Sequence, residues 1–264
     1  MPVIDAHSHI YPEKISKKAD EAVGKFYSAH MDSPDASAQA LLDMCANSPI
    51  THHLVHSVAT SAAQVETIND FVAEQCAQHD NFIGFATMHQ DYENMEAEID
   101  RAIGLGLKGV KIHPDNQKVN MDDPRLMHLY EIIEGRLPIV IHTGDYRYDY
   151  SHPRRLKKIL HTFPNLVVDA AHFGGWSVFD YALELLEDEN CYVDTSSALE
   201  FLGPRRTVEM CRAYGIDRVM FGSDFPMWNP VSELNMLEAM DFTPAELEAI
   251  TWRNAERFIG QEIK

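Results

Sequence analysis

The feature that most constrains the fold of this chain is a repeated alternation of two kinds of segment. A short apolar run rich in β-branched residues ends in polar residues, and a longer amphipathic stretch follows it. Continuous apolar runs such as LPIVIHTG suit strands that are buried on both faces, as in a parallel sheet. The expected strands are Val3–His9, His52–Val58, Phe82–Met88, Leu107–His113, Pro138–Thr143, Leu166–His172, Cys191–Thr195 and Arg218–Ser223.

The segments between these strands carry helical patterns and helix-start signals. Pro124, Pro153 and Pro204 suit the first turn of a helix. Thr243 and Glu246 have the spacing of a capping box before the last helix. The expected helices are Asp35–Asn47, Ala62–His79, Tyr92–Leu105, Pro124–Glu134, Pro153–Phe163, Ser177–Asp188, Pro204–Tyr214, Pro230–Met240 and Thr243–Ile259.

Eight alternations of strand and helix predict an α/β fold, a single (β/α)8 TIM barrel. A doubly wound open sheet is the structural alternative, but it usually has fewer strands. No linker or low-complexity segment divides the chain, so residues 1–264 are expected to form one domain. The longer polar segment Tyr11–Pro34 follows the first strand. It is expected to form part of the barrel mouth, with a helical turn over Glu13–Val23.

Charge and composition narrow the classes of partner. The chain has 22 Lys and Arg against 41 Asp and Glu, a formal charge of −19. Nucleic acids and anionic membranes need a basic face, so a small-molecule substrate is expected instead, while homo-oligomerisation stays open. No run of 18 apolar residues and no signal-peptide pattern is present, and the four cysteines contain no Cys-x-x-Cys pair. The expected location is the cytoplasm.

Histidines, together with one aspartate, cluster at the carboxyl ends of the expected strands. Barrel active sites are assembled at that face from the ends of several strands. Five of the 14 histidines lie there, and an aspartate follows the eighth strand. These residues are His7, His9, His113, His142, His172 and Asp224.

The spacing of these residues points to a metal site. His7 and His9 are two apart in a strand and therefore share a face. Neutral imidazoles and carboxylates are good ligands for zinc and similar divalent ions. A single His-x-His pair or a single Asp would more often be structural. Three buried histidines and an aspartate at one end of an apolar barrel, however, need something that pairs them.

The other histidines are interpreted as structural or solvated. His52, His53 and His56 resemble a cluster, but the second strand is expected to end beyond them. The full set given this interpretation is His30, His52, His53, His56, His79, His89, His128, His152 and His161.

The motifs IDAHSHI, GVKIHP, IVIHTG, AHFGG and MFGSDFP occur in this order, and a closing TWRNAERFIG segment follows. In this the chain resembles the amidohydrolase superfamily, and within it the branch of aminocarboxymuconate-semialdehyde decarboxylase. The resemblance covers nearly the whole chain.

The resemblance implies one divalent ion, with zinc favoured and manganese as the second choice, held by His7, His9, His142 and Asp224. It implies that His172 is a catalytic acid or base or a substrate contact. Asp224, which touches the ion, can also accept a proton. Phenolic-acid decarboxylases of this branch often carry Glu at the place of His7, so the retained histidine speaks against that particular activity.

Residues near the predicted ion are candidates for binding substrate. In binuclear relatives a carboxylated lysine bridges two ions, and Lys111 could fill that role, pair with a substrate anion, or form a structural ion pair. One ion and a charge-pairing Lys111 are favoured. His113 shares the face of Lys111, and Arg147 could clamp a carboxylate. Trp176 follows a Gly-Gly turn and is expected to contact substrate.

Three functions remain open from the sequence. Hydrolysis by metal-activated water is favoured, because a water beside Asp224 is the least demanding use of these residues. Non-oxidative decarboxylation is the first alternative, and a hydratase or lactonase would use the same groups. The third function is that of a non-catalytic, metal-containing binding barrel. In such a protein, His172 would have no role, because it is not among the four predicted ligands. The fold does not choose among them.

Overall fold

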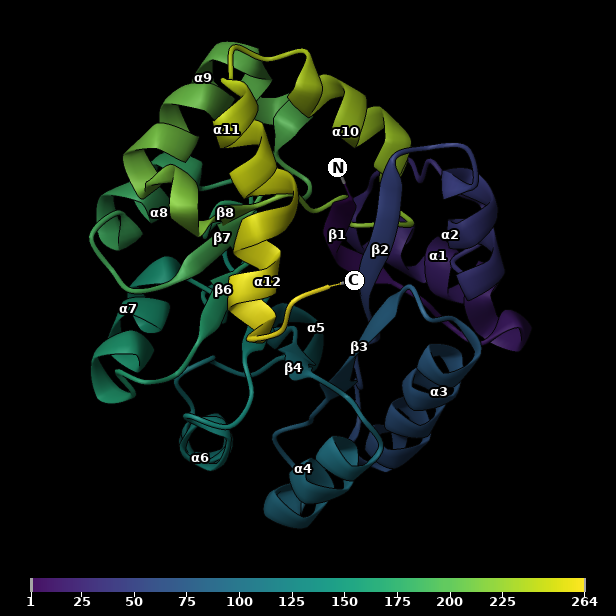
Figure 1. The fold of residues 1–264 in the computed structure, drawn as a ribbon. Coiled ribbons are helices and arrows are strands. Elements are labelled where there is room, and N and C mark those ends of the chain that lie inside the picture. Colours follow the sequence, from purple (N-terminus) through teal and green to yellow (C-terminus); the bar gives the residue numbers. More distant parts are fainter. Residues whose placement is uncertain (1, 264) are drawn as a thin grey trace.

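The core of the molecule is a closed barrel of eight parallel strands in chain order (Figure 1). The computed structural model describes residues 2–263. The strands are β1 (Val3–His9), β2 (Ile50–His56), β3 (Phe82–Thr87), β4 (Gly109–Ile112), β5 (Ile139–Ile141), β6 (Val168–Ala170), β7 (Tyr192–Asp194) and β8 (Val219–Met220). Ala6 N donates to Phe221 O at 2.8 Å, which joins the last strand to the first. The predicted (β/α)8 barrel is confirmed.

Helices follow the strands and surround the barrel (Figure 1). They are α1 (Glu13–Tyr27), α2 (Ala38–Cys45), α3 (Val65–Gln78), α4 (Met95–Gly104), α5 (Pro114–Gln117), α6 (Pro124–Ile133), α7 (Pro153–Thr162), α8 (Phe179–Leu186), α9 (Leu199–Tyr214), α10 (Pro230–Glu238), α11 (Pro244–Glu248) and α12 (Asn254–Ile259). The short segments η1 (Ala62–Gln64), η2 (Ile216–Arg218) and η3 (Ala249–Arg253) complete them.

The helix starts follow from local chemistry. Asp123 and Asn229 accept hydrogen bonds from backbone amides of α6 and α10, and a proline stands in the first turn of each. Thr243 and Glu246 form the predicted capping box at α11. Pro204 begins only the second part of α9, because Gly203 has a φ of 69° and breaks the helix there.

Besides the break in α9, three helical segments differ from the sequence prediction. The helical turn expected in the first loop is a full helix, α1, of 15 residues. The short helix α5 after β4 was not predicted. The expected last helix is divided into α11, the π-helical η3 and α12. None of these differences changes the barrel, but α1 and α5 both add residues to its mouth.

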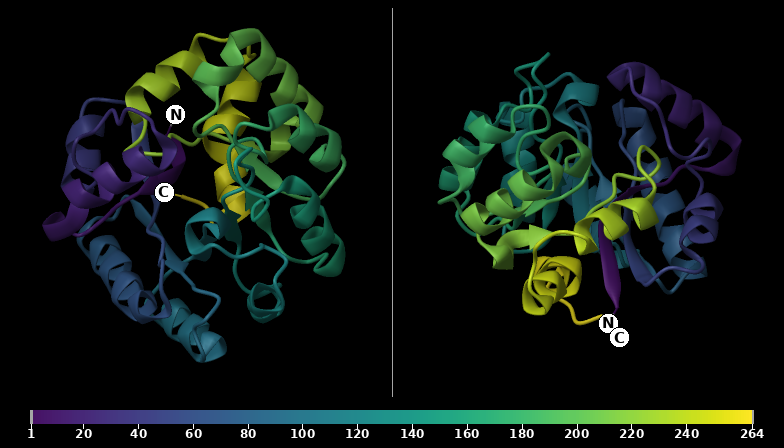
Figure 2. Two further views of the ribbon diagram at one scale, coloured as in Figure 1. Left: turned by 180° about the vertical axis from the view of Figure 1, so that it is seen from behind. Right: turned by 90° about the horizontal axis from the view of Figure 1, so that it is seen from above.

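The two ends of the barrel are used differently. At the amino-terminal end, Phe258 of α12 packs on Phe85 of β3 with ring centroids 5.9 Å apart, inside the cluster that fills the barrel. Figure 2 (right) shows both chain ends on this side and α1 on the opposite side. The carboxyl end of the barrel, under α1, is therefore the end left for a site. Within residues 2–263 no helix is long and apolar enough to cross a membrane.

Glu233 of α10 is expected to make stability depend on pH. Burial raises the pKa of this carboxyl to about 8, and the charges of Asp32 and Asp5 add to the effect. An unfolded glutamate titrates near 4.3. The folded state therefore binds more protons between these values, and the free energy of unfolding falls as pH rises through this window. Glu233→Gln should be more stable than the parent by about 5 kcal/mol at pH 8.5.

Chemical denaturation at pH 4.5 and pH 8.5 tests this expectation. The difference between the two proteins should shrink to near zero at the lower pH, where both side chains are neutral. Glu238, on the exposed side of the same helix, supplies the control variant Glu238→Gln. An equal stability gain at both pH values would show that the carboxyl charge is not the cause.

Candidate functional site

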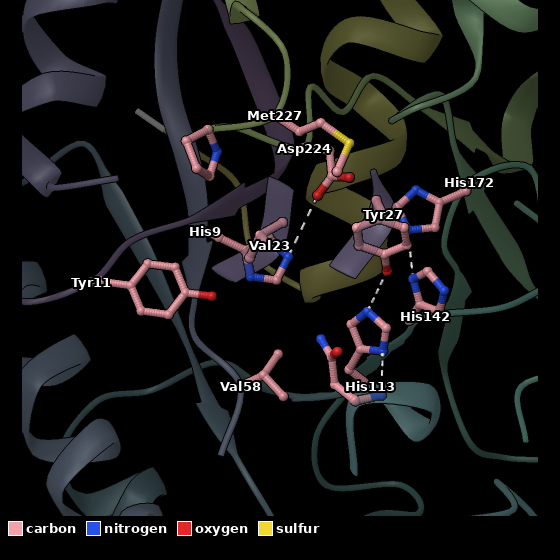
Figure 3. A pocket seen from close by; sticks show the side chains of 12 residues that line it. His9, Tyr11, Val23, Tyr27, Val58, His113, His142, His172, Asp224 and Met227 are labelled. Carbon is pink, nitrogen blue, oxygen red and sulfur yellow. Dashed lines mark hydrogen bonds and ion pairs between the residues drawn. The ribbon is translucent and has the colours of Figure 1, made fainter. Parts of the chain in front are cut away.

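The site begins with three groups from the first and last strands. His7 and His9 lie at the carboxyl end of strand β1, and Asp224 follows β8. Asp224 Oδ1 is 3.5 Å from His7 Nε2 and 3.5 Å from His9 Nε2. Two ligands that are each about 2.1 Å from one ion lie roughly 3–4 Å apart, so these spacings suit a shared divalent ion. Figure 3 shows the His9 ring and the Asp224 carboxylate directed toward each other.

Local backbone geometry aims Asp224 at β1. Its amide donates to His7 O at 2.8 Å, and its φ is 63°, in the left-handed region that side chains other than glycine seldom occupy. Its second oxygen, Oδ2, accepts a hydrogen bond from Ser197 Oγ at 2.5 Å. Trp228 Nε1 donates to the same Ser197 hydroxyl at 2.8 Å. Oδ1 of Asp224 therefore faces the two histidines, and Oδ2 is held by Ser197.

A buried carboxylate from β7 fixes the ring of His7. His7 Nδ1 is 2.7 Å from Asp194 Oδ2, and both side chains are fully buried. When Nδ1 carries the proton, Nε2 presents its lone pair to the site, as in the carboxylate–histidine–metal arrangement. Burial lowers the pKa of His7 and His9 well below the usual range of histidine, and the charge of Lys111 lowers both further. Both rings are thus neutral and able to act as ligands.

Lys111 of β4 lies under this group and is completely buried. Its Nζ is 3.2 Å from His7 Nε2. Burial lowers the pKa of Lys111 to about 8, while the charges of Asp224, Asp194 and Asp169 raise it. Lys111 does not line the cavity, so direct contact with a substrate there is not seen. Its charge-pairing role stays a prediction.

His172 and His142 form the other side of the site. His172 Nε2 is 3.0 Å from His142 Nδ1. The opposite nitrogen of His172, Nδ1, lies 3.1 Å from Ser196 O and 2.8 Å from Ser196 Oγ. Since a carbonyl oxygen only accepts, the proton of neutral His172 belongs on Nδ1, and Nε2 presents a lone pair to the site. His172 also has a positive φ, of 61°.

His113 and His142 stack, with ring centroids 3.8 Å apart and planes 10° from parallel. His113 Nε2 is 2.8 Å from the hydroxyl of Tyr27, a residue of α1. His142 Nε2 is 3.4 Å from Asp115 Oδ2. The structure thus joins His7, His9 and Asp224 directly and places His142 beside His172. That all four bind one ion stays a prediction.

The cavity between these groups has a volume of about 30 Å³, and Val23 and Tyr27 of α1 contribute to its lining (Figure 3). Its walls are apolar and aromatic, and its floor carries the ionisable groups. Burial keeps the pKa of Tyr27 well above the usual range of tyrosine, so its hydroxyl stays protonated. The lining residues are His9, Tyr11, Val23, Tyr27, Val58, His113, Asn116, His142, His172, Asp224, Pro226 and Met227.

Arg147 and Trp176, which were predicted to bind substrate, do not line this cavity. The Arg147 guanidinium donates to both oxygens of Asp145 and to Phe26 O at the end of α1. Trp176 packs edge-on against Tyr27, with ring centroids 5.1 Å apart. Arg147 is therefore satisfied by the protein itself and holds α1 in place, which a count of cationic residues in the sequence does not reveal.

His56 is the site residue that the sequence analysis set aside. The second strand ends at His56 and not at Val58, so this side chain lies in the mouth. Its ring is 4.4 Å from that of His9 and 4.9 Å from that of His7, centroid to centroid. Neither of its ring nitrogens has a hydrogen-bond partner among residues 2–263. His56, His7 and His9 could jointly contact an ion.

Solved structures with the same barrel were compared with the chain. A putative amidohydrolase from Staphylococcus aureus is 18% identical, with a TM-score of 0.75 and coverage of 98% of this chain and 100% of that one. A 2,6-dihydroxybenzoate decarboxylase from Rhizobium is 18% identical, with a TM-score of 0.75 and coverage of 98% and 99%. A 5-carboxyvanillate decarboxylase from Novosphingobium aromaticivorans with bound manganese is 16% identical, with a TM-score of 0.75 and coverage of 98% and 97%.

These similarities are below 25% identity and establish the shared fold. A search of the curated proteins found no match. A scan against family models matched the amidohydrolase family over residues 4–261, nearly the full chain. The chain therefore belongs to the amidohydrolase family.

Proposed function

We propose that this protein is a metal-dependent carboxy-lyase, which removes carbon dioxide from a small planar carboxylic acid without oxidation. One observation carries the choice over hydrolysis, which the sequence alone favoured. A hydrolase would use Asp224 to take a proton from water, but Asp224 Oδ1 is directed at His7 and His9, and Oδ2 accepts the Ser197 hydroxyl. Both oxygens are thus oriented for a ligand role, and in the proposed reaction the proton transfer is carried by His172.

The donor groups fit a divalent ion. Two neutral imidazoles and one carboxylate converge from β1 and the end of β8, and Asp194 holds the proton of His7 on the far nitrogen. His142 is the proposed fourth ligand. When bound, a divalent ion supplies Lewis-acid polarisation of a substrate oxygen. We propose one ion, either zinc or manganese, and manganese in the decarboxylase from Novosphingobium aromaticivorans makes it the first to test.

The residues of the chain would carry out the remaining steps. Tyr11 and Tyr27 offer hydroxyls that orient polar substituents, and the apolar side chains of Val23, Val58 and Met227 exclude water. As the bond between the substrate carbon and its carboxyl group breaks, the electron pair stays on that carbon. Protonated His172 then delivers the proton from Nε2 to this carbon, and carbon dioxide leaves. Ser196 keeps the ring in the required orientation through Nδ1.

Two of the similar structures support this choice of reaction class. They are decarboxylases of 2,6-dihydroxybenzoate and 5-carboxyvanillate. Both names denote aromatic carboxylates, so aromatic and enoic acids are the first substrates to test. Metal-dependent hydrolysis remains the second candidate, because neutral His172 presents a lone pair that could accept a proton from water.

The experiment that separates the two reactions traces the carboxyl carbon of the substrate and the oxygen of the solvent water. Metal-loaded protein is incubated in ¹⁸O-labelled water with a panel of hydroxybenzoates, enoic acids, lactones and amides. Release of carbon dioxide from a substrate labelled with ¹³C in its carboxyl group, with the decarboxylated product in equal amount, is expected. Metal-stripped protein is the control. Labelled oxygen in an acid product, without release of carbon dioxide, would replace this proposal with hydrolysis.

A further inference from the structure

We infer that the acid that this protein decarboxylates has an elongated apolar body, which lies in a groove between α1 and the segment after β2 while its carboxyl group enters the cavity. The groove has a volume of about 470 Å³ and is open to solvent. This inference rests on the proposed function and names the shape of the substrate that the site takes.

The cavity at the candidate ion site is too small for the whole of a carboxylic acid. A void of roughly 10–15 Å³ holds one water molecule, and this cavity has a volume of about 30 Å³. That space suits a group of the size of a carboxylate. Sites that enclose most of a small-molecule ligand usually have volumes of roughly 300–1,000 Å³, and the groove of about 470 Å³ lies in this range.

The groove continues into the cavity, because the same five residues line both spaces. They are Tyr11, Val23, Tyr27, Val58 and Asn116. Figure 3 shows Tyr11 and Val58 on the side of the cavity opposite His142. A carboxyl group held among the candidate ion ligands would therefore direct the rest of the molecule past Val23 and Val58 into the groove.

The walls of the groove suit an apolar body. One wall is α1, whose apolar residues recur at helical spacing along the groove: Ile15, Ala19, Ala22 and Phe26. Thr60 and Gln64, which follow β2 in the chain, also line the groove. The Ile15 side chain is 48% exposed. An apolar ligand in the groove would remove this surface from water, and the hydrophobic effect would favour its binding.

The charge of the groove also favours an acid. Within residues 2–263, Lys18 is the one charged residue that lines it. The chain has a formal charge of −19, so a lining with a cation and no carboxylate departs from the overall charge balance. A local positive charge attracts an anionic ligand and repels an amine.

A second copy of the chain is the competing occupant of the groove. A standard protein interface covers about 800 Å² of each partner and needs apolar groups that a partner can reach. Apart from Ile15, the large apolar side chains of the groove are half-buried or buried, and they are Val23, Phe26, Tyr27 and Val58. Recessed groups of this kind are more accessible to a small molecule than to a protein surface.

The test measures the Kd of straight-chain 2-enoic acids, from butenoic to decenoic acid, by calorimetry on protein supplied with manganese. In the parent, each added methylene should tighten binding by about three- to fourfold until the groove is filled. Ala22→Trp places a large side chain in the groove and should remove most of this gain. Glu21→Trp is the matched control, because Glu21 is exposed on the same helix and does not line the groove. The control should show the same gain as the parent.

The matching alcohol, dec-2-en-1-ol, has the same apolar body without the carboxylate and should bind more weakly than decenoic acid. Equal binding of the alcohol, a Kd that does not change along the series, or an undiminished gain in Ala22→Trp would overturn the inference. A flat series, together with a parent dimer that Ala22→Trp dissociates in light scattering, would assign the groove to a second copy of the chain. Binding that tightens with chain length, without release of carbon dioxide from any acid, would instead refute the proposed function and leave the groove assignment in place.

Discussion

His7→Ala is expected to abolish stable binding of the divalent ion and to lower kcat/KM by at least about 10³-fold. His7 is the residue of the group with the most contacts at the site: its Nε2 faces Asp224, and its Nδ1 is held by Asp194. The substitution removes a ligand and also leaves the buried Asp194 carboxylate without its partner. Metal content after dialysis, measured by mass spectrometry, and steady-state kinetics check the two parts of the prediction.

His128→Ala is the matched control for this experiment. The His128 side chain is 63% exposed on α6 and should change neither metal content nor rate. Thermal unfolding of metal-free His7→Ala must also be compared with the metal-free parent, because loss of the fold would mimic loss of the ion. A folded His7→Ala protein that retains one equivalent of ion and its activity would contradict the ligand assignment.

His172→Asn should lower kcat by on the order of 10²-fold or more while leaving the bound ion nearly unchanged. The physical reason is that His172 Nε2 faces the site, whereas Nδ1 is anchored on Ser196. Asparagine keeps a polar group of similar reach but transfers no proton at neutral pH. The measurement pairs metal analysis with the rate of carbon dioxide release from the best substrate found.

The same variant also tests the number of ligands. His172 Nε2 lies 3.0 Å from His142 Nδ1, so an ion bound at one nitrogen is close to the other. Loss of the ion from folded His172→Asn would identify His172 as a ligand and not as a proton donor. An unchanged rate with unchanged metal content would remove His172 from the mechanism altogether.

The barrel could be predicted because its signal is local and repeated. Each buried strand is a short apolar run, and the polar residues that end it mark the face where a site forms. His7, His9 and Asp224 were found in this way, since each ends or follows a strand. The structure brings these three together within hydrogen-bonding or ion-pairing reach.

Residues whose role depends on a contact between distant segments could not be predicted. A shift of two residues in the end of β2 moved His56 from an expected mid-strand position to the mouth. Asp194 and Asp115 carry no motif, and only the barrel geometry places them behind His7 and His142. Arg147 resembled a substrate clamp, but Asp145, two residues earlier, already occupies its guanidinium.

The position of α1 suggests how this protein can acquire a new substrate preference. All 15 residues of α1 belong to one loop between β1 and β2, and the helix supplies Val23 and Tyr27 to the cavity. None of the groups proposed to hold the ion lies in it. Under the proposed function, α1 would therefore influence selectivity without holding the ion, and Arg147 binds Phe26 O near its carboxyl end. Grafting a different helix between β1 and β2 offers a route to altered selectivity on an unchanged chemical centre.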